Sequence, residues 1–563
     1  MVKGDQIPGT AKRVTAVTET LVRLSDDTEC VSVTTPNFHS EVTMKPAKEI
    51  ADFVFAEQHP TQGVTLLIDK NRRQDPSIQR WAMDMAKQHP GAKTEFVTLS
   101  ELSQRRESAV AQGLVVTEND LDKKDVSRSQ DKVLSYFSLA YELHSSDIHF
   151  EISADRKLTI IRMRIHGELE VIDELTDEEG ITLVSTVYIS MCDVREQSFY
   201  MGREQSGRVD AKFARQAGLY GARYEHRATP DGLFVVMRMI PDDSKNMPTL
   251  PQLGFLPGQI GIVMQMLRLP SGMVLLTGPT GSGKSASMRS FCDLWMKLTG
   301  GKKLLLTLEN PTEGLMPGAI QTQVMPDDNS PEAISRAWNN GNASSLRLDP
   351  DALGTGEMRD LYSILAAIYA CETGHLFFST LHTKTPIGAL RRMELFGIDR
   401  RLLADPSLIV GLIGQRLVPL LCENCKISWS DKMPELNMET RERLKKYCNV
   451  EGVCTPQQLF FRNPEGCECC RKVVPFNGRI VSKGVTGRAA VAEVMRTDAR
   501  MMKIWLSDGP DAARLDWIKR GGISRLMHLM RYLAEGRVDP LEADLICPLD
   551  EDEHLHSEAS HVA

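Results

Sequence analysis

Short, mainly apolar runs bounded by glycine or polar residues recur in the second half of the chain. Examples are Met273–Leu276, Leu304–Leu308 and Leu376–Leu381. Runs of about four to eight such residues are typical of strands buried on both faces, as in a parallel sheet flanked by helices. The pattern therefore predicts an α/β domain from about Leu256 onward.

The first half of the chain has a different pattern. Leu158–Ile165 and Leu233–Ile240 alternate in polarity or are rich in β-branched residues, which predicts strands of an α+β domain. Before them, residues 1 to about 110 combine a strand-like run, Val64–Ile68, with a helical run, Ile78–Lys87. This mixture predicts a small α/β module.

The polar, proline-bounded segment Pro241–Pro248 predicts a hinge between domains. The acidic run Asp550–Glu553 begins a tail that we expect to be disordered. The predicted parts are an N-terminal partner-binding domain at 1–115, a second N-terminal domain at 116–245, a hinge linker at 246–256, an α/β domain at 257–547 with a cysteine-rich insertion at about 419–475, and an acidic tail at 548–563.

Composition narrows the class of protein. The chain has 563 residues and a formal net charge of −8, so no global field attracts it to nucleic acid or anionic lipid. No apolar stretch reaches the ~18 residues of a membrane helix, and the residues after Met1 are polar rather than a signal core. We therefore expect a cytoplasmic protein.

A glycine-rich segment follows the first apolar run. It consists of Gly278, Pro279, Thr280, Gly281, Ser282, Gly283, Lys284 and Ser285. This is the P-loop pattern, in which glycines let backbone N–H groups surround phosphate oxygens and the next helix N-terminus favours negative charge. We expect Lys284 to reach the β- and γ-phosphates and Ser285 to ligate Mg²⁺. The chain is thus predicted to bind a nucleoside triphosphate.

Acidic and histidine residues lie next to later apolar runs. Glu309 directly follows Leu308, Glu357 lies in a Gly-Glu-Met-Arg-Asp segment, and His375 and His382 flank Leu376–Leu381. Ligands of open α/β sheets bind beyond the carboxyl ends of strands. We therefore expect Glu309 and Glu357 to converge on one phosphate site, where His382 can sense the γ-phosphate by a hydrogen bond.

Two Cys-x-x-Cys pairs, Cys422/Cys425 and Cys467/Cys470, suit tetrahedral Zn²⁺ in a structural role. A redox pair is the competing interpretation, but no thioredoxin-like pattern surrounds them. Cys469 leaves the second pairing open, and Cys448 and Cys454 are further competing ligands.

Several segments together resemble the secretion ATPase superfamily, which drives type II secretion and type IV pilus assembly. The P-loop, Thr307–Glu313, Leu346–Asp360 and Thr373–Thr383 resemble its Walker A, Asp-box, Walker B and His-box motifs. Further similar segments are Ser145–Glu151, Ile161–Gly167, Tyr224–Met239, Gly414–Leu417 and Gly484–Met495. The resemblance covers about Val133 to Met495, around two-thirds of the chain.

The resemblance implies a RecA-like P-loop ATPase domain preceded by a PAS-like α+β domain. It makes Glu357 the Walker B carboxylate that orients water and Glu309 a second acidic group at the γ-phosphate. It also implies that His375 and His382 communicate phosphate occupancy. Three arginines of the second domain would reach the nucleotide as the domains close: Arg164, Arg227 and Arg238.

The resemblance also implies partners and cofactors. They are ATP, Mg²⁺ and Zn²⁺, a homohexamer, and a platform protein of the inner membrane, at which the protein would be peripheral. The zinc module marks the branches that secrete or extend pili. The implied activity is ATP hydrolysis coupled to assembly of a type IV pilus or a type II secretion pseudopilus.

The chain departs from the family pattern at four places: Asn310 replaces Asp in the Asp-box, Gly354-Thr355 replaces bulky apolar residues before Gly-Glu, His166 replaces Asp, and Ala286 replaces a hydroxyl residue. These departures motivate one alternative, a nucleotide-binding regulator with negligible turnover. A type IV secretion or conjugation ATPase is another alternative, against which the cysteine pairs argue. A nucleic-acid translocase is disfavoured by the acidic net charge.

Overall fold

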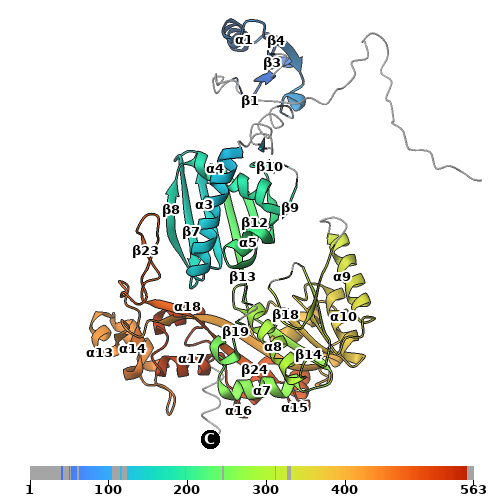
Figure 1. Ribbon diagram of the computed structural model, residues 1–563, viewed down its shortest axis with the longest axis vertical. Helices are drawn as coiled ribbons and strands as arrows, with labels where there is room; N and C mark the ends of the chain where they lie inside the picture. The colour runs from blue at the N-terminus through green and yellow to red at the C-terminus, as the bar shows by residue number, and fades with distance from the viewer. Residues whose placement is uncertain are drawn as a thin grey trace, which may run out of the picture. The chain divides into compact units, whose positions relative to one another are not determined.

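The computed structural model describes residues 40–41, 50, 52–59, 63–103, 105, 115–116, 123–196, 198–243, 246–310, 312, 314–325 and 331–553. The chain divides into two compact units, Met1–Gly113 and Leu114–Ala563, which can be followed by colour in Figure 1. Each unit has its own hydrophobic core.

The first unit is a small sheet covered by a helix. Its strands are β1 (Ser40–Glu41), β2 (Val54–His59), β3 (Gly63–Asp69) and β4 (Lys93–Val97), in that order across the sheet. Helix α1 (Pro76–Gln88) joins β3 to β4, and these two strands are parallel, as a helical crossover requires. The predicted strand and helix of this module are confirmed. Residues 1–39 of the predicted partner-binding domain lie outside the described residues.

The second unit begins with an α+β domain built on an antiparallel sheet. The strand order is β8-β7-β6-β13-β12-β11-β9. Helices α3 (Lys123–Glu142), α4 (Asp177–Thr186) and α5 (Ala211–Gln216) lie over one face of the sheet (Figure 1). The strands are β6 (Asp147–Ser153), β7 (Leu158–Ile165), β8 (Glu168–Leu175), β9 (Cys192–Val194), β11 (Gln205–Val209), β12 (Leu219–Thr229) and β13 (Gly232–Pro241), and a separate pair joins β5 (Val115–Val116) to β10 (Phe199–Tyr200).

The two strands predicted in this domain are present as β7 and within β13. Along β7, buried and half-buried residues alternate, because one face of the sheet packs under the helices. Beyond β13, the segment predicted as a hinge linker at 246–256 is partly helical. It contains α6 (Leu250–Leu253), whose Leu250 is buried in the core of the α/β domain.

The third part is an α/β domain with a central sheet of order β16-β15-β17-β18-β14-β19-β24. Its first six strands are parallel and β24 is antiparallel to β19. The strands are β14 (Gly272–Thr277), β15 (Leu305–Glu309), β16 (Ile320–Gln323), β17 (Ala352–Thr355), β18 (Leu376–Leu381), β19 (Ile409–Leu421) and β24 (Val485–Arg496).

Both faces of this sheet are covered by helices. Met273 and Leu275 of β14 belong to one core cluster, whereas Val274 and Leu276 belong to another, because successive residues of a strand point to opposite faces. This confirms the α/β class predicted from the apolar runs. The helices are α7 (Pro257–Leu267), α8 (Lys284–Leu298), α9 (Pro331–Ser345), α10 (Leu361–Glu372), α11 (Gly388–Leu395), α12 (Arg400–Leu403), α15 (Ala499–Asp508), α16 (Pro510–Lys519), α17 (Arg525–Ala534) and α18 (Pro540–Ile546).

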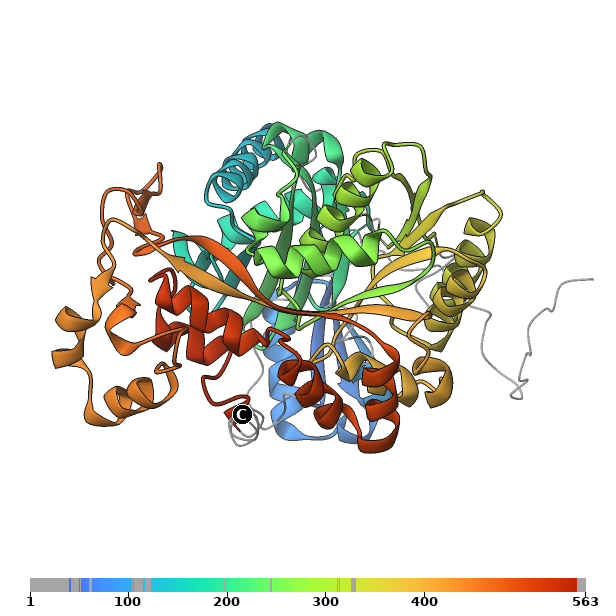
Figure 2. The same ribbon diagram turned by 90° about the horizontal axis from the view of Figure 1, so that it is seen from below.

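A cysteine-containing insertion joins β19 to β24 and is drawn in orange in Figure 2. It holds β20 (Ile427–Ser428), α13 (Trp429–Lys432), α14 (Met438–Tyr447), β21 (Phe460–Phe461) and the pair β22 (Lys472–Val473) and β23 (Ile480–Val481). Val474 and Val481 from this hairpin belong to the hydrophobic core of the α+β domain. The insertion therefore contacts both other parts of its unit.

The acidic tail differs from the prediction. Asp552 is buried, and it accepts hydrogen bonds from both terminal nitrogens of Arg514, at 2.6 and 2.7 Å. Glu551 pairs with Arg525 at 2.8 Å. The expectation of disorder was wrong for Asp550–Glu553, because these carboxylates pair with arginines and a lysine of the α/β domain and its insertion; residues 554–563 lie outside the described residues. Among the described helices, none is long and apolar enough to cross a membrane.

Candidate functional site

The P-loop connects β14 to α8 at the carboxyl edge of the central sheet. Gly278, Gly281 and Gly283 have positive φ angles of 148°, 77° and 83°. A Cβ on Gly278 would lie 2.4 Å from the Gln415 carbonyl oxygen and 2.6 Å from Ser282 Oγ. Glycine is therefore required at this position, both for its backbone angle and for the space beside it.

Lys284, the first residue of α8, folds back over this loop. Its Nζ donates hydrogen bonds to the carbonyl oxygens of Gly278 and Pro279, both at 2.9 Å. The ammonium thus lies buried inside the loop at the N-terminus of a helix, where anions are favoured. Ser285 follows it and is half-buried.

The two predicted glutamates lie at the same sheet edge as the P-loop. Glu309 ends β15 and Glu357 follows β17, which is the parallel neighbour of β15. Glu309 is buried and accepts hydrogen bonds from Thr307 Oγ1 at 2.8 Å and from Gln321 Nε2 at 3.0 Å. The structure therefore holds this carboxylate in one orientation.

Glu357 contacts a predicted histidine. Its carboxylate lies 3.3 Å from His382 Nε2 and accepts a hydrogen bond of 3.0 Å from Arg359 Nε. Burial lowers the pKa of His382, and the positive charge of Lys284 lowers it further, whereas Glu357 opposes the shift. The ring is therefore neutral at neutral pH and can donate one hydrogen bond to Glu357. Lys284, Glu357 and His382 therefore lie close enough for their charges to interact.

His375 is not part of that group. It precedes β18, whereas His382 follows it, and its carbonyl accepts from Gly272 N at the start of β14. It therefore lies at the amino edge of the sheet, a strand length away from the P-loop. Its Nδ1 lies 3.0 Å from the Ala370 carbonyl oxygen, which is a local contact to α10.

The three predicted arginines bond within the α+β domain. Arg164 donates to the Gly167 carbonyl at 2.9 Å and Arg238 pairs with Asp147 at 3.1 Å. Arg227 is exposed and pairs with Glu204 at 2.9 Å. In this arrangement of the described residues, the structure does not bring them to Lys284.

An open cavity of about 290 Å³ adjoins the start of α8. The α+β domain contributes His144 and His166 to its lining, and the α/β domain contributes Gly283, Ser287 and Arg488 among others. Burial, assisted by the charge of Arg488, lowers the pKa of His166 to about 4. The sequence does not predict this cavity, because its lining comes from segments far apart in the chain.

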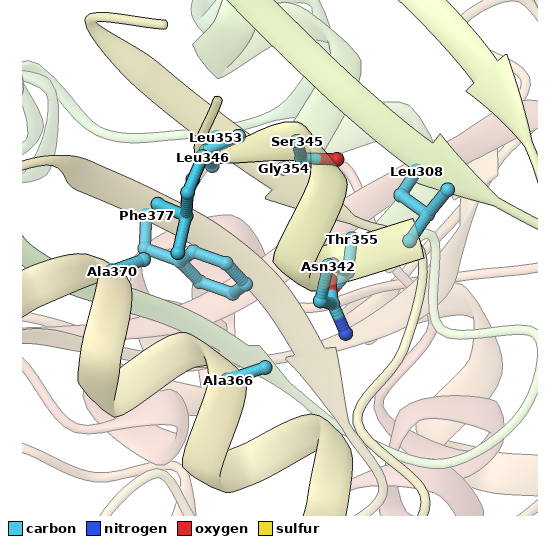
Figure 3. A pocket seen from close by; sticks show the side chains of 10 residues that line it. All are labelled: Leu308, Asn342, Ser345, Leu346, Leu353, Gly354, Thr355, Ala366, Ala370 and Phe377. Carbon is cyan, nitrogen blue, oxygen red and sulfur yellow. The ribbon is translucent and has the colours of Figure 1, made fainter. Parts of the chain in front are cut away.

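The Gly354-Thr355 departure leaves β17 paired with both neighbours. Thr355 Oγ1 lies 2.9 Å from Ser379 Oγ of β18, which adds a side-chain link between the strands. Beside Gly354 is a cavity of about 10 Å³, shown in Figure 3, whose lining also includes Asn342 and Phe377. A space of this size holds at most one water molecule.

Four cysteines of the insertion come together. The ligand atoms of Cys422, Cys425, Cys467 and Cys470 all lie within 4.8 Å of one another. The Sγ–Sγ distances are 3.7 Å for Cys422–Cys467, 3.8 Å for Cys425–Cys470 and 3.9 Å for Cys467–Cys470. Sulfurs tetrahedrally arranged about 2.3 Å from a zinc ion are about 3.8 Å apart. The donor set and its spacing therefore fit Zn²⁺.

The structure also bears on the competing cysteines. Cys469 is exposed and outside the group of four, whereas Cys448 and Cys454 are buried in the hydrophobic core of the insertion. A hydrogen bond from the Cys469 backbone N–H is the main cause that lowers the pKa of Cys467 to about 7. This favours the thiolate of Cys467, the form that binds metals, whereas burial raises the pKa of Cys422 and Cys425.

A P-loop after an interior strand of a mainly parallel sheet, with two acidic residues and a histidine at the ends of other parallel strands, defines a P-loop nucleoside triphosphatase. Comparison with sequence families defines the protein more narrowly than this broad class. The model of the family described as "Type II/IV secretion system protein" matches residues 122–526, and the chain belongs to this family.

Relatives with curated names agree with this assignment. The chain is 31% identical over 391 residues to "Type II secretion system protein E" of Aeromonas hydrophila, covering 69% of this chain and 70% of that protein. It is 29% identical over 405 residues to the "Type IV pilus assembly ATPase PilB" of Acinetobacter baylyi, covering 70% and 63%. Among solved structures, the pilus retraction motor PilT with bound ADP is 21% identical, with 73% and 95% coverage and a TM-score of 0.44.

Proposed function

We propose that this protein is an ATPase that couples ATP hydrolysis to the assembly of a type IV pilus or a type II secretion pseudopilus. The observation that carries the proposal is the grouping of Lys284, Glu357 and His382 at one sheet edge with Glu309 beside them. Phosphoryl transfer needs such positioning and charge more than covalent chemistry from the protein.

ATP would bind with its phosphates on the P-loop. Lys284 would exchange its two carbonyl partners for phosphate oxygens, which carry more negative charge. Mg²⁺, held with help from the Ser285 hydroxyl, would neutralise charge on the phosphates. The cavity lined by His144, His166 and Arg488 adjoins the P-loop and is the space for the ribose and base.

Glu357 would orient the water that attacks the γ-phosphorus, with ADP as the leaving group. His382 holds this carboxylate from one side and Arg359 from the other. Because His382 contacts Glu357 and feels the charge of Lys284, it is suited to report whether phosphate is present. Arg164, Arg227 and Arg238 would be brought to the nucleotide by closure of the α+β domain, where a guanidinium stabilises phosphate charge.

Zn²⁺ would be held by the four cysteines in a closed structural site. By analogy with the relatives, the protein would work as a homohexamer, peripheral at the inner membrane and bound to a platform protein. Residues 1–115 are the segment that we propose chooses this partner.

Steady-state ATP hydrolysis tests the proposal. Glu357→Gln should lower kcat by about 10²-fold or more while ATP still binds, and Glu372→Gln at the exposed end of α10 is the matched control. Equal, very low rates in wild type and Glu357→Gln would instead favour the nucleotide-binding regulator, which the Asn310 and Gly354-Thr355 departures motivate. Mass photometry with and without nucleotide tests the hexamer.

A further inference from the structure

The linker between the α+β and α/β domains, here the Pro241–Pro248 segment, is attached to the P-loop helix. Arg289 of α8 is buried, and its Nη2 donates to Asp243 Oδ2 of the linker at 2.7 Å. The next residue, Ser290, donates from Oγ to the Pro248 carbonyl oxygen at 2.7 Å. The helix that begins at Lys284 therefore holds the linker at two points, about one and a half turns from the phosphate-binding end.

The other side of the Arg289 guanidinium meets the loop that follows Glu309. Gly314 in this loop has a φ angle of 126°, and a Cβ there would lie 2.7 Å from Arg289 Nη1. The contact is thus possible only for glycine. Arg289 lies between Asp243 of the linker and Gly314 of the loop.

The loop is in turn bonded to the Glu309 side chain through Gln321 of β16. Gln321 Nε2 donates to the Gly314 carbonyl at 2.9 Å and to Glu309 Oε1 at 3.0 Å. Gln321 Oε1 accepts from Met316 N at 2.8 Å, which fixes the orientation of the amide. A continuous set of contacts therefore runs from Asp243 through Arg289, Gly314 and Gln321 to Glu309.

We propose that Arg289 and Gln321 are positioning residues that make the orientation of Glu309 depend on the position of the interdomain linker. The proposal rests on the proposed function, because it gives Glu309 a part in hydrolysis. Neither residue needs to touch ATP.

The physical basis is the buried charge of Arg289. When the domains move, a linker that withdraws Asp243 leaves the guanidinium buried beside one fewer carboxylate, which is costly. The guanidinium is then free to shift away from Gly314 toward its other partners or water. The loop loses its support, and Gln321 loses the acceptor that holds its amide against Glu309. Linker position and carboxylate orientation are coupled in this way.

Single-turnover and steady-state kinetics test whether the contact between Arg289 and Asp243 affects hydrolysis. Arg289→Met and Asp243→Asn should each lower kcat about tenfold, with the dissociation constant for ATP within about twofold of wild type, because binding groups are untouched. The double variant should be no worse than Arg289→Met alone, since that variant already removes the contact with Asp243. Arg289→Lys, which keeps the charge, should recover part of the rate. Lys297→Gln, which breaks an exposed pair with Asp293 on the same helix, should have no effect.

Hydrogen exchange on the nucleotide-free full chain tests whether the linker and the loop beside Glu309 are coupled, and it does not require turnover. Asp243→Asn should increase exchange in residues 314–323 as well as in the linker, and Gln321→Leu should increase it in residues 314–323 alone. Increased exchange confined to the linker and α8 would overturn the proposal, as would multiplicative effects of Arg289→Met and Asp243→Asn on kcat. If wild type fails to hydrolyse ATP, the proposed function fails, whereas the exchange result still decides whether the contacts are coupled.

Discussion

The nucleotide site and the cysteine group differ in how complete they are. The four sulfurs already have the spacing of tetrahedral ligands. At the P-loop, in contrast, Lys284 is bonded to the loop's own carbonyl oxygens, and Arg164, Arg227 and Arg238 bond inside another domain. A structural metal site gains from being preformed, whereas a motor site has to change between states to do work. The contrast indicates that the hydrogen bonds of Lys284 and of the three arginines are the contacts expected to change during the ATPase cycle.

The strongest test of this contrast is Lys284→Ala. Removing the ammonium should lower kcat/KM for ATP by about 10²-fold or more, because the charge acts at the phosphates in a water-poor site. The melting temperature without nucleotide should change little, since the bonds lost are to carbonyls that water can reach once the side chain is gone. Lys303→Ala, at an exposed pair with Asp351, is the control, and a comparable loss there would contradict the assignment.

Cys467→Ser, in contrast to Lys284→Ala, should act mainly on stability. We expect loss of bound zinc, measured by mass spectrometry of the native protein, and unfolding of the insertion that costs several kcal/mol, since metal binding is folding energy for such modules. Cys469→Ser should retain one zinc per chain, because Cys469 lies outside the group of four. Loss of zinc in Cys469→Ser would show that the ligand set is wrong.

Asp552→Asn tests whether the acidic tail belongs to the fold. Arg514 is buried between Asp552 and Glu493, so removal of one charge should lower the free energy of unfolding by about 3 kcal/mol. Glu553→Gln, which affects an exposed pair with Lys446 and an exposed hydrogen bond from Tyr447, should change it by less than about 1 kcal/mol. Chemical denaturation measures both, and equal values would place Asp552 in solvent.

A smaller effect is expected from pH at β24, the strand shared by the ATPase sheet and the insertion. His528 Nδ1 accepts from Ala492 N at 3.0 Å, and burial lowers the pKa of His528 from 6.5 to about 4. Between these values the unfolded chain binds more protons, so stability rises with pH and is lost as pH falls from 6.5 toward 4. The expected loss from this group by pH 5 is roughly 2 kcal/mol.

His528→Asn tests this assignment, because its side-chain oxygen can replace Nδ1 as an acceptor without titrating. Denaturant titrations at pH 7.5 and pH 5 should show a smaller pH dependence in the variant than in wild type. Because the pKa of His166 is also lowered to about 4, part of the pH dependence should remain. An unchanged difference between the two pH values would rule out His528 as its source.

The sequence predicted those features whose residues are close together in the chain or follow a strand. The P-loop, the cysteine pairs and the placing of Glu309 and Glu357 at one edge are of this kind, since the edge follows from parallel strands alone. His375 shows the limit of such reasoning: a histidine at either end of a strand looks equivalent in sequence, but only the carboxyl end faces the P-loop.

Other features depend on residues that pair in the fold but are far apart in the sequence. Arg289 meets Asp243, 46 residues earlier, and Arg514 meets Asp552, 38 residues later. An isolated arginine or a run of acidic residues is more typical of a solvated surface, which is why the tail was predicted to be disordered. The cavity beside α8 was missed for the same reason, because His166 and Arg488 come from different domains.

The length of β19 has a mechanical consequence. The strand runs from Ile409 to Leu421, and its Gln415 donates to the Ser282 carbonyl of the P-loop at 2.7 Å. Cys422 of the group of four cysteines follows β19 directly, so this group lies about 20 Å along the strand from Gln415. β19 is paired with β24 over most of its length, so the bond to Ser282 and the cysteine group are attached to the same strand pair. At the hairpin, Asn477 donates to the Ile172 carbonyl at 2.6 Å, so the insertion links the strand that contacts the P-loop to the α+β domain.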